Sequence, residues 1–169
     1  MRKYFIIIIV VMVVVILYVT VFVNMGKTDK NINSPQISKG TLDLTGWDFN
    51  EYEPLKLDGE WEFYWKQLLE PSDFNINLPG ENEFLQVPRS WNRYSYGTKF
   101  SPEGYATYRL IINTKPQDNV LALRIPRILT AYRIWINNKL MSSCGVIGEN
   151  ASNSKGRVVP NTIFFSNNS

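Results

Sequence analysis

Hydrophobic and polar positions divide this chain of 169 residues into an apolar run, a polar stretch and a region of short alternating segments. The run from Tyr4 to Val23 is 20 residues long, carries no charge and contains one mildly polar residue, Thr20. Since a helix rises about 1.5 Å per residue, the run reaches about 30 Å, the thickness of the hydrocarbon layer of a bilayer. The pattern predicts a transmembrane α-helix, because a helix satisfies its own backbone hydrogen bonds in lipid.

The charges beside the run predict its orientation. Arg2 and Lys3 precede it, and the far flank, residues 24–27, is less basic. Because the Lys/Arg excess stays in the cytoplasm, we expect residues 1–3 to be a cytoplasmic stub, 4–23 a cell-membrane anchor and the rest extracytoplasmic. The alternative is a cleaved secretory signal, although the run exceeds the usual core of about 7–15 residues and no Ala-x-Ala-like site follows. Under both interpretations the rest of the chain is extracytoplasmic.

The rest of the chain predicts a linker followed by a β domain. Residues 24–39 are mostly polar and contain Pro35, as in a flexible linker. Beyond them, apolar and polar residues alternate, which is typical of half-buried strands. The predicted strands are 60–65, 84–87, 106–112, 121–125 and 132–136. In the first, one face carries Trp61, Phe63 and Trp65, and the other carries Glu60, Glu62 and Tyr64.

Local signals refine this pattern. Asn137-Asn138 predicts a tight hairpin, since Asn tolerates positive φ, and Pro126 is expected to end the strand before it. Residues 67–70, ahead of Pro71, are expected to form one helical turn. The region 40–169 is therefore predicted to be all-β, a sandwich or jelly roll. Only one strand follows Pro160, so we expect a truncated domain from a longer protein; an exposed sheet edge is the alternative.

Composition excludes several classes of site. The chain has 18 basic and 15 acidic residues, and only +1 remains of its net +3 when Arg2 and Lys3 are set aside. A near-neutral region does not predict nucleic-acid binding. The chain has no histidine, which excludes His-based zinc sites and Ser-His-Asp triads. Cys144 is the only cysteine and is expected to be a partly buried small residue; no cofactor or metal is predicted.

Several segments, in order along the chain, carry a family resemblance. They are residues 40–44 (GTLDL) with Trp47, 57–65 (LDGEWEFYW), Val87-Pro88 with Trp91, 104–110 (GYATYRL) and 132–137 (YRIWIN). This set resembles the extracytoplasmic jelly-roll sensor domain of bacterial seven-transmembrane receptors that carry histidine kinase or diguanylate cyclase outputs. It is more distantly similar to the galactose-binding-like, non-catalytic domain of family 2 glycoside hydrolases. Asn138 departs from that pattern, which has glycine in the hairpin.

Candidate ligand-binding residues lie in two places. Arg89, Trp91, Arg93, Tyr94 and Tyr96 fall in a loop, and flat aromatic rings beside guanidinium groups suit sugars or small organic ligands. Trp91 is also interpretable as a plug of the sandwich end. Arg133 and Trp135 share one strand face, which suits a binding surface or contact with missing strands.

A pair of carboxylates is the remaining candidate. Glu60 and Glu62 have a spacing compatible with glycoside hydrolysis, but a solvated strand face is the favoured interpretation. The chain is therefore expected to have no catalytic residue.

Together with the apolar run, the resemblance implies the ligand-sensing outer domain of a bacterial signal-transduction receptor. Its partners would be the bilayer, a small molecule or glycan, and signalling domains further along the parent chain, with a homodimer permitted by the single anchor. The alternatives are a carbohydrate-binding module of an envelope protein or glycoside hydrolase, and a purely structural module.

Overall fold

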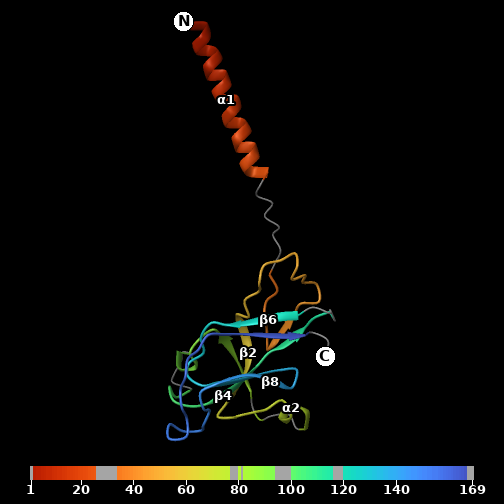
Figure 1. The fold of residues 1–169 in the computed structure, drawn as a ribbon, viewed down its shortest axis with the longest axis vertical. Helices are drawn as coiled ribbons and strands as arrows, with labels where there is room; N and C mark the ends of the chain where they lie inside the picture. The colour runs from red at the N-terminus through yellow and green to blue at the C-terminus, as the bar shows by residue number, and fades with distance from the viewer. Residues whose placement is uncertain are drawn as a thin grey trace. The chain divides into compact units, whose positions relative to one another are not determined.

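The computed structural model describes residues 2–25, 34–76, 80, 82–93, 100–115 and 120–166 of the chain. The chain forms two units, residues 1–34 and a larger compact unit from Pro35 to Ser169 (Figure 1). The second unit begins ahead of the boundary at residue 40 that the sequence suggested, because Ile37 is buried and bridges to Gly59.

The first unit contains helix α1 (Arg2–Met25), 24 residues long. It includes the whole apolar run, so the predicted helix forms. Its side chains are described for residues 11–22, and all of these are exposed in the chain. Among the residues that the structure describes, no helix qualifies by length and apolar character as a membrane span. The membrane-spanning role of α1 stays a prediction.

The compact unit consists mostly of β-strands and is compatible with an all-β sandwich. Its strands are β1 (Thr41–Asp43), β2 (Gly59–Trp65), β3 (Glu83–Val87), β4 (Ala106–Arg109), β5 (Ile111–Asn113), β6 (Val120–Ile125), β7 (Tyr132–Ile136), β8 (Lys139–Cys144) and β9 (Asn161–Ser166). Two short helical segments join them, α2 (Asp73–Ile76) and the 3-10 turn η1 (Trp91–Arg93).

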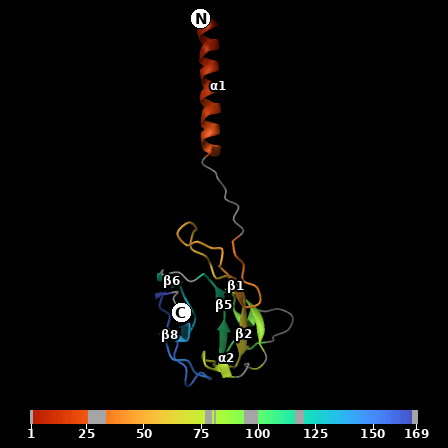
Figure 2. The ribbon, with the colours of Figure 1, turned by 90° about the vertical axis from the view of Figure 1, so that its right-hand side faces the viewer.

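The strands pair in four sheets. Antiparallel pairing gives the order β3-β2-β4, and β1 pairs with β5 in parallel. Strand β6 pairs with β9, and β7 with β8, both antiparallel. Figure 2 shows β6 and β8 on one side of the compact unit and β1, β5 and β2 on the other. This two-sided arrangement separates the later strands from the earlier ones.

The predicted hairpin is confirmed. Asn137 and Asn138 connect β7 to β8 with φ angles of 48° and 65°, the left-handed pair that a two-residue type I′ turn requires. Strand β6 ends at Ile125, directly before Pro126, as expected. Alternation is also confirmed on β7, where Tyr132 is buried and Arg133 is exposed.

Apart from Tyr64, the buried apolar side chains of the described chain fall into three clusters. The first is centred on Ile125, Tyr132, Cys144 and Ile163, and it joins β6, β7, β8 and β9 into one packed half. The second is centred on Ile37, Leu42 and Leu44, and the third on Phe63, Leu85 and Phe100.

Two expectations are wrong. Residues 67–70 form no helical turn, because the Thr107 hydroxyl binds the Gln67 carbonyl and the Leu69 amide instead. The polar face of β2 is also not simply solvated: Tyr64 is buried, because residues 66–76 fold over that face. We call residues 66–76 the covering segment.

Candidate functional site

Trp91 is held in an aromatic cluster. Its ring lies 5.5 Å from that of Trp65, edge to face, and 6.4 Å from that of Phe63. Its indole N–H donates a hydrogen bond of 2.9 Å to the carbonyl of Ser101. Since the indole nitrogen and much of the ring are engaged within the protein, these contacts favour the structural interpretation of Trp91.

Two predicted cations flank Trp91. Arg89 precedes η1 and Arg93 ends it, and both are exposed. The turn between them is fixed by a hydrogen bond of 3.1 Å from the Arg93 amide to the Ser90 carbonyl. Tyr94 and Tyr96 lie outside the described residues. The described part of the loop therefore presents two guanidinium groups next to a partly exposed indole.

The second pair of predicted residues lies on β7. Arg133 is exposed and forms an ion pair of 3.7 Å with Glu70 of the covering segment. Trp135 is partly buried. The register of β7 against β8 shifts between Ile134 and Trp135, so Trp135 lies opposite Leu140. Because both members of the Arg133–Glu70 pair are about half exposed, solvent weakens this contact.

These two groups of residues lie toward opposite faces of the β3-β2-β4 sheet. Tyr64 is paired with Thr107, so their side chains share one face, and Phe63 points to the other. Trp91 packs against Phe63, whereas Arg133 reaches the covering segment, which is bonded to Thr107. The loop around Trp91 and the Arg133–Trp135 strand therefore form two separate surfaces, on opposite faces of this sheet.

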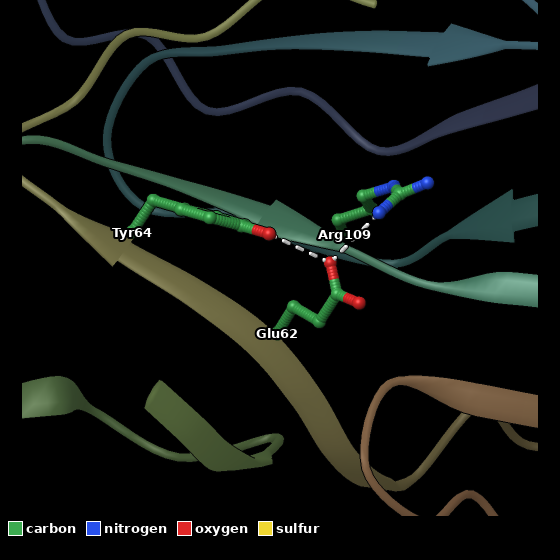
Figure 3. A network of polar contacts seen from close by, with 3 residues as sticks. All are labelled: Glu62, Tyr64 and Arg109. Carbon is green, nitrogen blue, oxygen red and sulfur yellow. Dashed lines mark hydrogen bonds and ion pairs between the residues drawn. The ribbon is translucent and has the colours of Figure 1, made fainter. Parts of the chain in front are cut away.

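Sequence reasoning missed a polar network on the covered face of β2 and β4. The Oε2 atom of Glu62 accepts two hydrogen bonds, one of 2.9 Å from the Tyr64 hydroxyl and one of 3.2 Å from the Arg109 guanidinium (Figure 3). The side chain of Glu62 is 13% exposed and that of Arg109 is 38% exposed. Glu62 and Arg109 are 47 residues apart in the chain, and only the pairing of β2 with β4 brings them together. The sequence pattern around either residue therefore did not indicate the contact.

Phe74 of α2 packs against two side chains of this network. The Arg109 guanidinium carbon lies 4.6 Å from the centre of the Phe74 ring, a cation–π contact, and the Tyr64 ring meets Phe74 edge to face at 5.4 Å. Burial, and then the hydrogen bond to Glu62, raise the pKa of Tyr64 above its usual value. The raised pKa means that the phenol keeps its proton, and its hydrogen bond to the carboxylate, to a higher pH than an ordinary tyrosine.

The network changes the interpretation of the two glutamates. Glu60 is exposed, whereas Glu62 is largely covered and engaged by Tyr64 and Arg109. Glu62 is thus neither on an open solvated face nor available as one of two carboxylates around a glycosidic bond. Its two partners, Tyr64 and Arg109, are the residues against which Phe74 of the covering segment packs.

Other polar residues have local roles. The Asp43 carboxylate accepts a hydrogen bond of 2.9 Å from the Thr45 amide, which lowers the pKa of Asp43. The Cys144 thiol is buried and donates to the Arg157 carbonyl at 3.4 Å. Within the described ranges, no three His, Cys, Asp or Glu side chains are grouped closely enough to hold a metal ion.

Comparisons with known proteins found no match to this chain among protein-family models, curated proteins or solved structures. The function is therefore inferred from the residues of the chain itself.

Proposed function

We propose that this chain is the membrane-anchored, extracytoplasmic ligand-sensing part of a bacterial signal-transduction receptor, built on a jelly-roll domain. The observation that carries the proposal is the succession of a 20-residue uncharged apolar run and a compact β unit that begins at Pro35. The resemblance of residues 40–148 to the sensor domains of seven-transmembrane receptors supports a ligand-sensing function for this arrangement.

The anchor is supported by the sequence and length of α1. Its described side chains, from Val11 to Phe22, are exposed on every side of the helix, and Thr20 donates its hydroxyl to the Leu17 carbonyl. Thr20 thereby satisfies its hydroxyl within the helix, as a polar residue in lipid must. A helix that is apolar around its whole circumference is typical of a membrane span.

Ligand binding is assigned first to the loop surface of Arg89, Trp91 and Arg93. Trp91 is anchored by Ser101 and two aromatic neighbours, and the exposed residues Arg89 and Arg93 flank it in the sequence. A fixed aromatic edge with guanidinium donors suits a sugar or a small polar organic molecule. Arg133 and Trp135 form the second candidate surface.

Signalling then requires that ligand affinity differ between two states of the receptor. The alternative function is a carbohydrate-binding module without signalling. The same loop surface serves both functions, so the segment that follows the domain in the parent protein separates them.

The anchor is tested by flotation of the full chain with membranes after alkaline carbonate extraction. Retention in the membrane fraction is expected, and complete release refutes the anchor. Reading the coding sequence beyond Ser169 tests the receptor assignment: further apolar spans with a kinase or cyclase support it, whereas a stop codon or a glycosidase barrel contradicts it.

Ligand binding is tested by thermal shift of the detergent-solubilised chain with galactose, glucose and glucuronate. Arg89→Gln and Arg93→Gln are expected to abolish any shift, which is measured for each variant from its own melting temperature without ligand. The matched controls are Lys56→Gln and Lys66→Gln, which remove exposed cations elsewhere on the compact unit. A shift that survives both arginine substitutions refutes the loop assignment and favours the Arg133–Trp135 surface.

A further inference from the structure

The near-zero charge of the extramembrane region conceals a separation of charge. Residues 120–166 contain six basic residues and one acidic residue, Glu149, whereas residues 40–93 contain four basic and eleven acidic residues. The six cations are exposed, and they are Arg124, Arg127, Arg133, Lys139, Lys155 and Arg157. Only Arg133 forms an ion pair with another residue that the structure describes.

Four of these cations gather at one end of the β6–β9 ladder. Arg124 is paired with Thr162, and Ile125 with Asn161, so residues 126–131 and 155–160 emerge from the same end. The Arg157 amide confirms their proximity, because it donates a hydrogen bond of 2.8 Å to the Thr130 carbonyl. We call Arg124, Arg127, Lys155 and Arg157, with the loops that carry them, the basic end.

Exposed apolar side chains are interleaved with these cations. Leu129 is 70% exposed and lies two residues from Arg127, and Val158 and Val159 directly follow Arg157. Along the outer face of the ladder, Val120 is 70% and Phe164 67% exposed. Because Phe164 is paired with Ala122, it stands on the same face as Arg124.

We propose that the basic end docks on an anionic phospholipid surface, with Leu129 and its apolar neighbours inserted at headgroup depth. Exposed Lys and Arg near such a surface each strengthen binding by roughly fivefold at physiological salt. Apolar side chains among cations are the combination that enters the boundary between headgroups and acyl chains. The acidic residues of 40–93 are repelled by the same surface, so the field also orients the domain.

The docking rests on the proposed membrane anchor. Nine residues lie between Met25 and Pro35, so the connection from Met25 to Pro35 spans at most about 35 Å. A domain tethered so closely meets the lipid at a high effective concentration, so even a weak basic surface suffices. A second copy of the chain, meeting the basic end with its acidic half, is the rival occupant.

The test uses the full chain in vesicles of phosphatidylcholine alone or with about 30% phosphatidylglycerol. A donor dye is attached to Thr162→Cys, at the basic end, or to Ser72→Cys, on the covering segment, and energy transfer to labelled lipid headgroups is measured. Both positions are exposed, and the native Cys144 is buried. In anionic vesicles, transfer from position 162 should exceed that from position 72, and the difference should disappear at about 0.5 M salt.

Charge-matched variants separate the possible causes. Arg124→Gln with Arg127→Gln should abolish the difference, and Lys56→Gln with Lys66→Gln should leave it intact. Equal transfer from the two positions in anionic vesicles overturns the proposal. A difference that grows with protein density at fixed lipid composition also overturns it and assigns the basic end to a second copy.

The anchor and the docking fail in distinguishable ways. Release by carbonate with salt-sensitive binding to anionic vesicles refutes the anchor and retains the docking. Carbonate-resistant insertion without an orientation difference refutes the docking alone.

Discussion

Arg109 and Glu62 stand directly opposite each other across the β2–β4 ladder, and the Arg109 guanidinium donates to Oε2 of Glu62 at 3.2 Å. The same oxygen accepts the Tyr64 hydroxyl. Phe74 of the covering segment then packs against both Arg109 and Tyr64. A single carboxylate therefore fixes the two side chains on which the covering segment rests.

Glu62→Gln should destabilise the compact unit by about 1–2 kcal/mol, because the neutral amide weakens two hydrogen bonds that the carboxylate accepts. The loss is smaller than for a fully buried pair, since Arg109 is more than a third exposed and water screens it. The measurement is urea denaturation of the full chain in detergent, followed by tryptophan fluorescence. Glu60→Gln is the control, with an expected change within about 0.5 kcal/mol; equal effects of the two variants contradict the assigned role of Glu62.

Thr107→Val should loosen the covering segment itself. The Thr107 hydroxyl donates to the Gln67 carbonyl at 2.8 Å and accepts from the Leu69 amide at 2.9 Å, and valine keeps the shape while removing both bonds. We expect the Leu69 amide to exchange its hydrogen at least about tenfold faster, with a loss of about 1 kcal/mol in stability. Thr162→Val, on the exposed face of β9, should change neither quantity. Unaltered exchange at Leu69 would show that other contacts hold the segment.

Some parts of this arrangement could be predicted from the sequence, and others could not. Local patterns sufficed for the β7–β8 hairpin, because alternation along 132–136 and the Asn137-Asn138 turn act within a few residues. The covering of Tyr64 was not predictable, since it depends on the contact between Leu69 and Thr107, which are 38 residues apart. Alternation correctly assigned Tyr64 and Phe63 to opposite faces of β2, but it carries no information about what covers each face.

The candidate site shows the same limit. The residue types around Trp91 indicated both a ligand surface and a structural plug, and only the contacts with Trp65 and Ser101 favour the second interpretation of the ring. Sequence reasoning assigned Arg133 to a second candidate surface without locating it, and its contact with Glu70 places it on the side of the sheet opposite Trp91. The sequence indicated which chemical groups the candidate residues carry, but the tertiary structure was needed to show which of them lie close together.

The ionisation of Tyr64 predicts a dependence of stability on alkaline pH. Its folded-state pKa lies above the ordinary value of 10.0, so the native state retains a proton that the unfolded state loses. The stability that Tyr64 contributes is fully present below pH 10 and is lost as the pH rises from 10 toward the folded-state pKa. Absorbance titrations of the wild type and of Tyr64→Phe should differ by one phenol that ionises above the ordinary value of 10.0.

The same variant has a second expected effect. Below pH 10, Tyr64→Phe should be less stable than the wild type, because Glu62 loses one hydrogen bond; the difference should shrink at higher pH. A gap that widens with rising pH would contradict the raised pKa.

In the hairpin turn, one substitution is expected to raise the stability of the protein rather than lower it. Asn138 has a φ of 65°, a conformation that glycine adopts without strain and that costs a residue with an ordinary Cβ about 1–2 kcal/mol. Asn138→Gly should therefore raise the stability by about 0.5 kcal/mol, whereas Asn138→Ala should lower it by about 1 kcal/mol. Both values are measurable by urea denaturation, and the alanine variant serves as the control for loss of the asparagine side chain. If glycine and alanine destabilise equally, the asparagine side chain rather than its backbone conformation stabilises the turn.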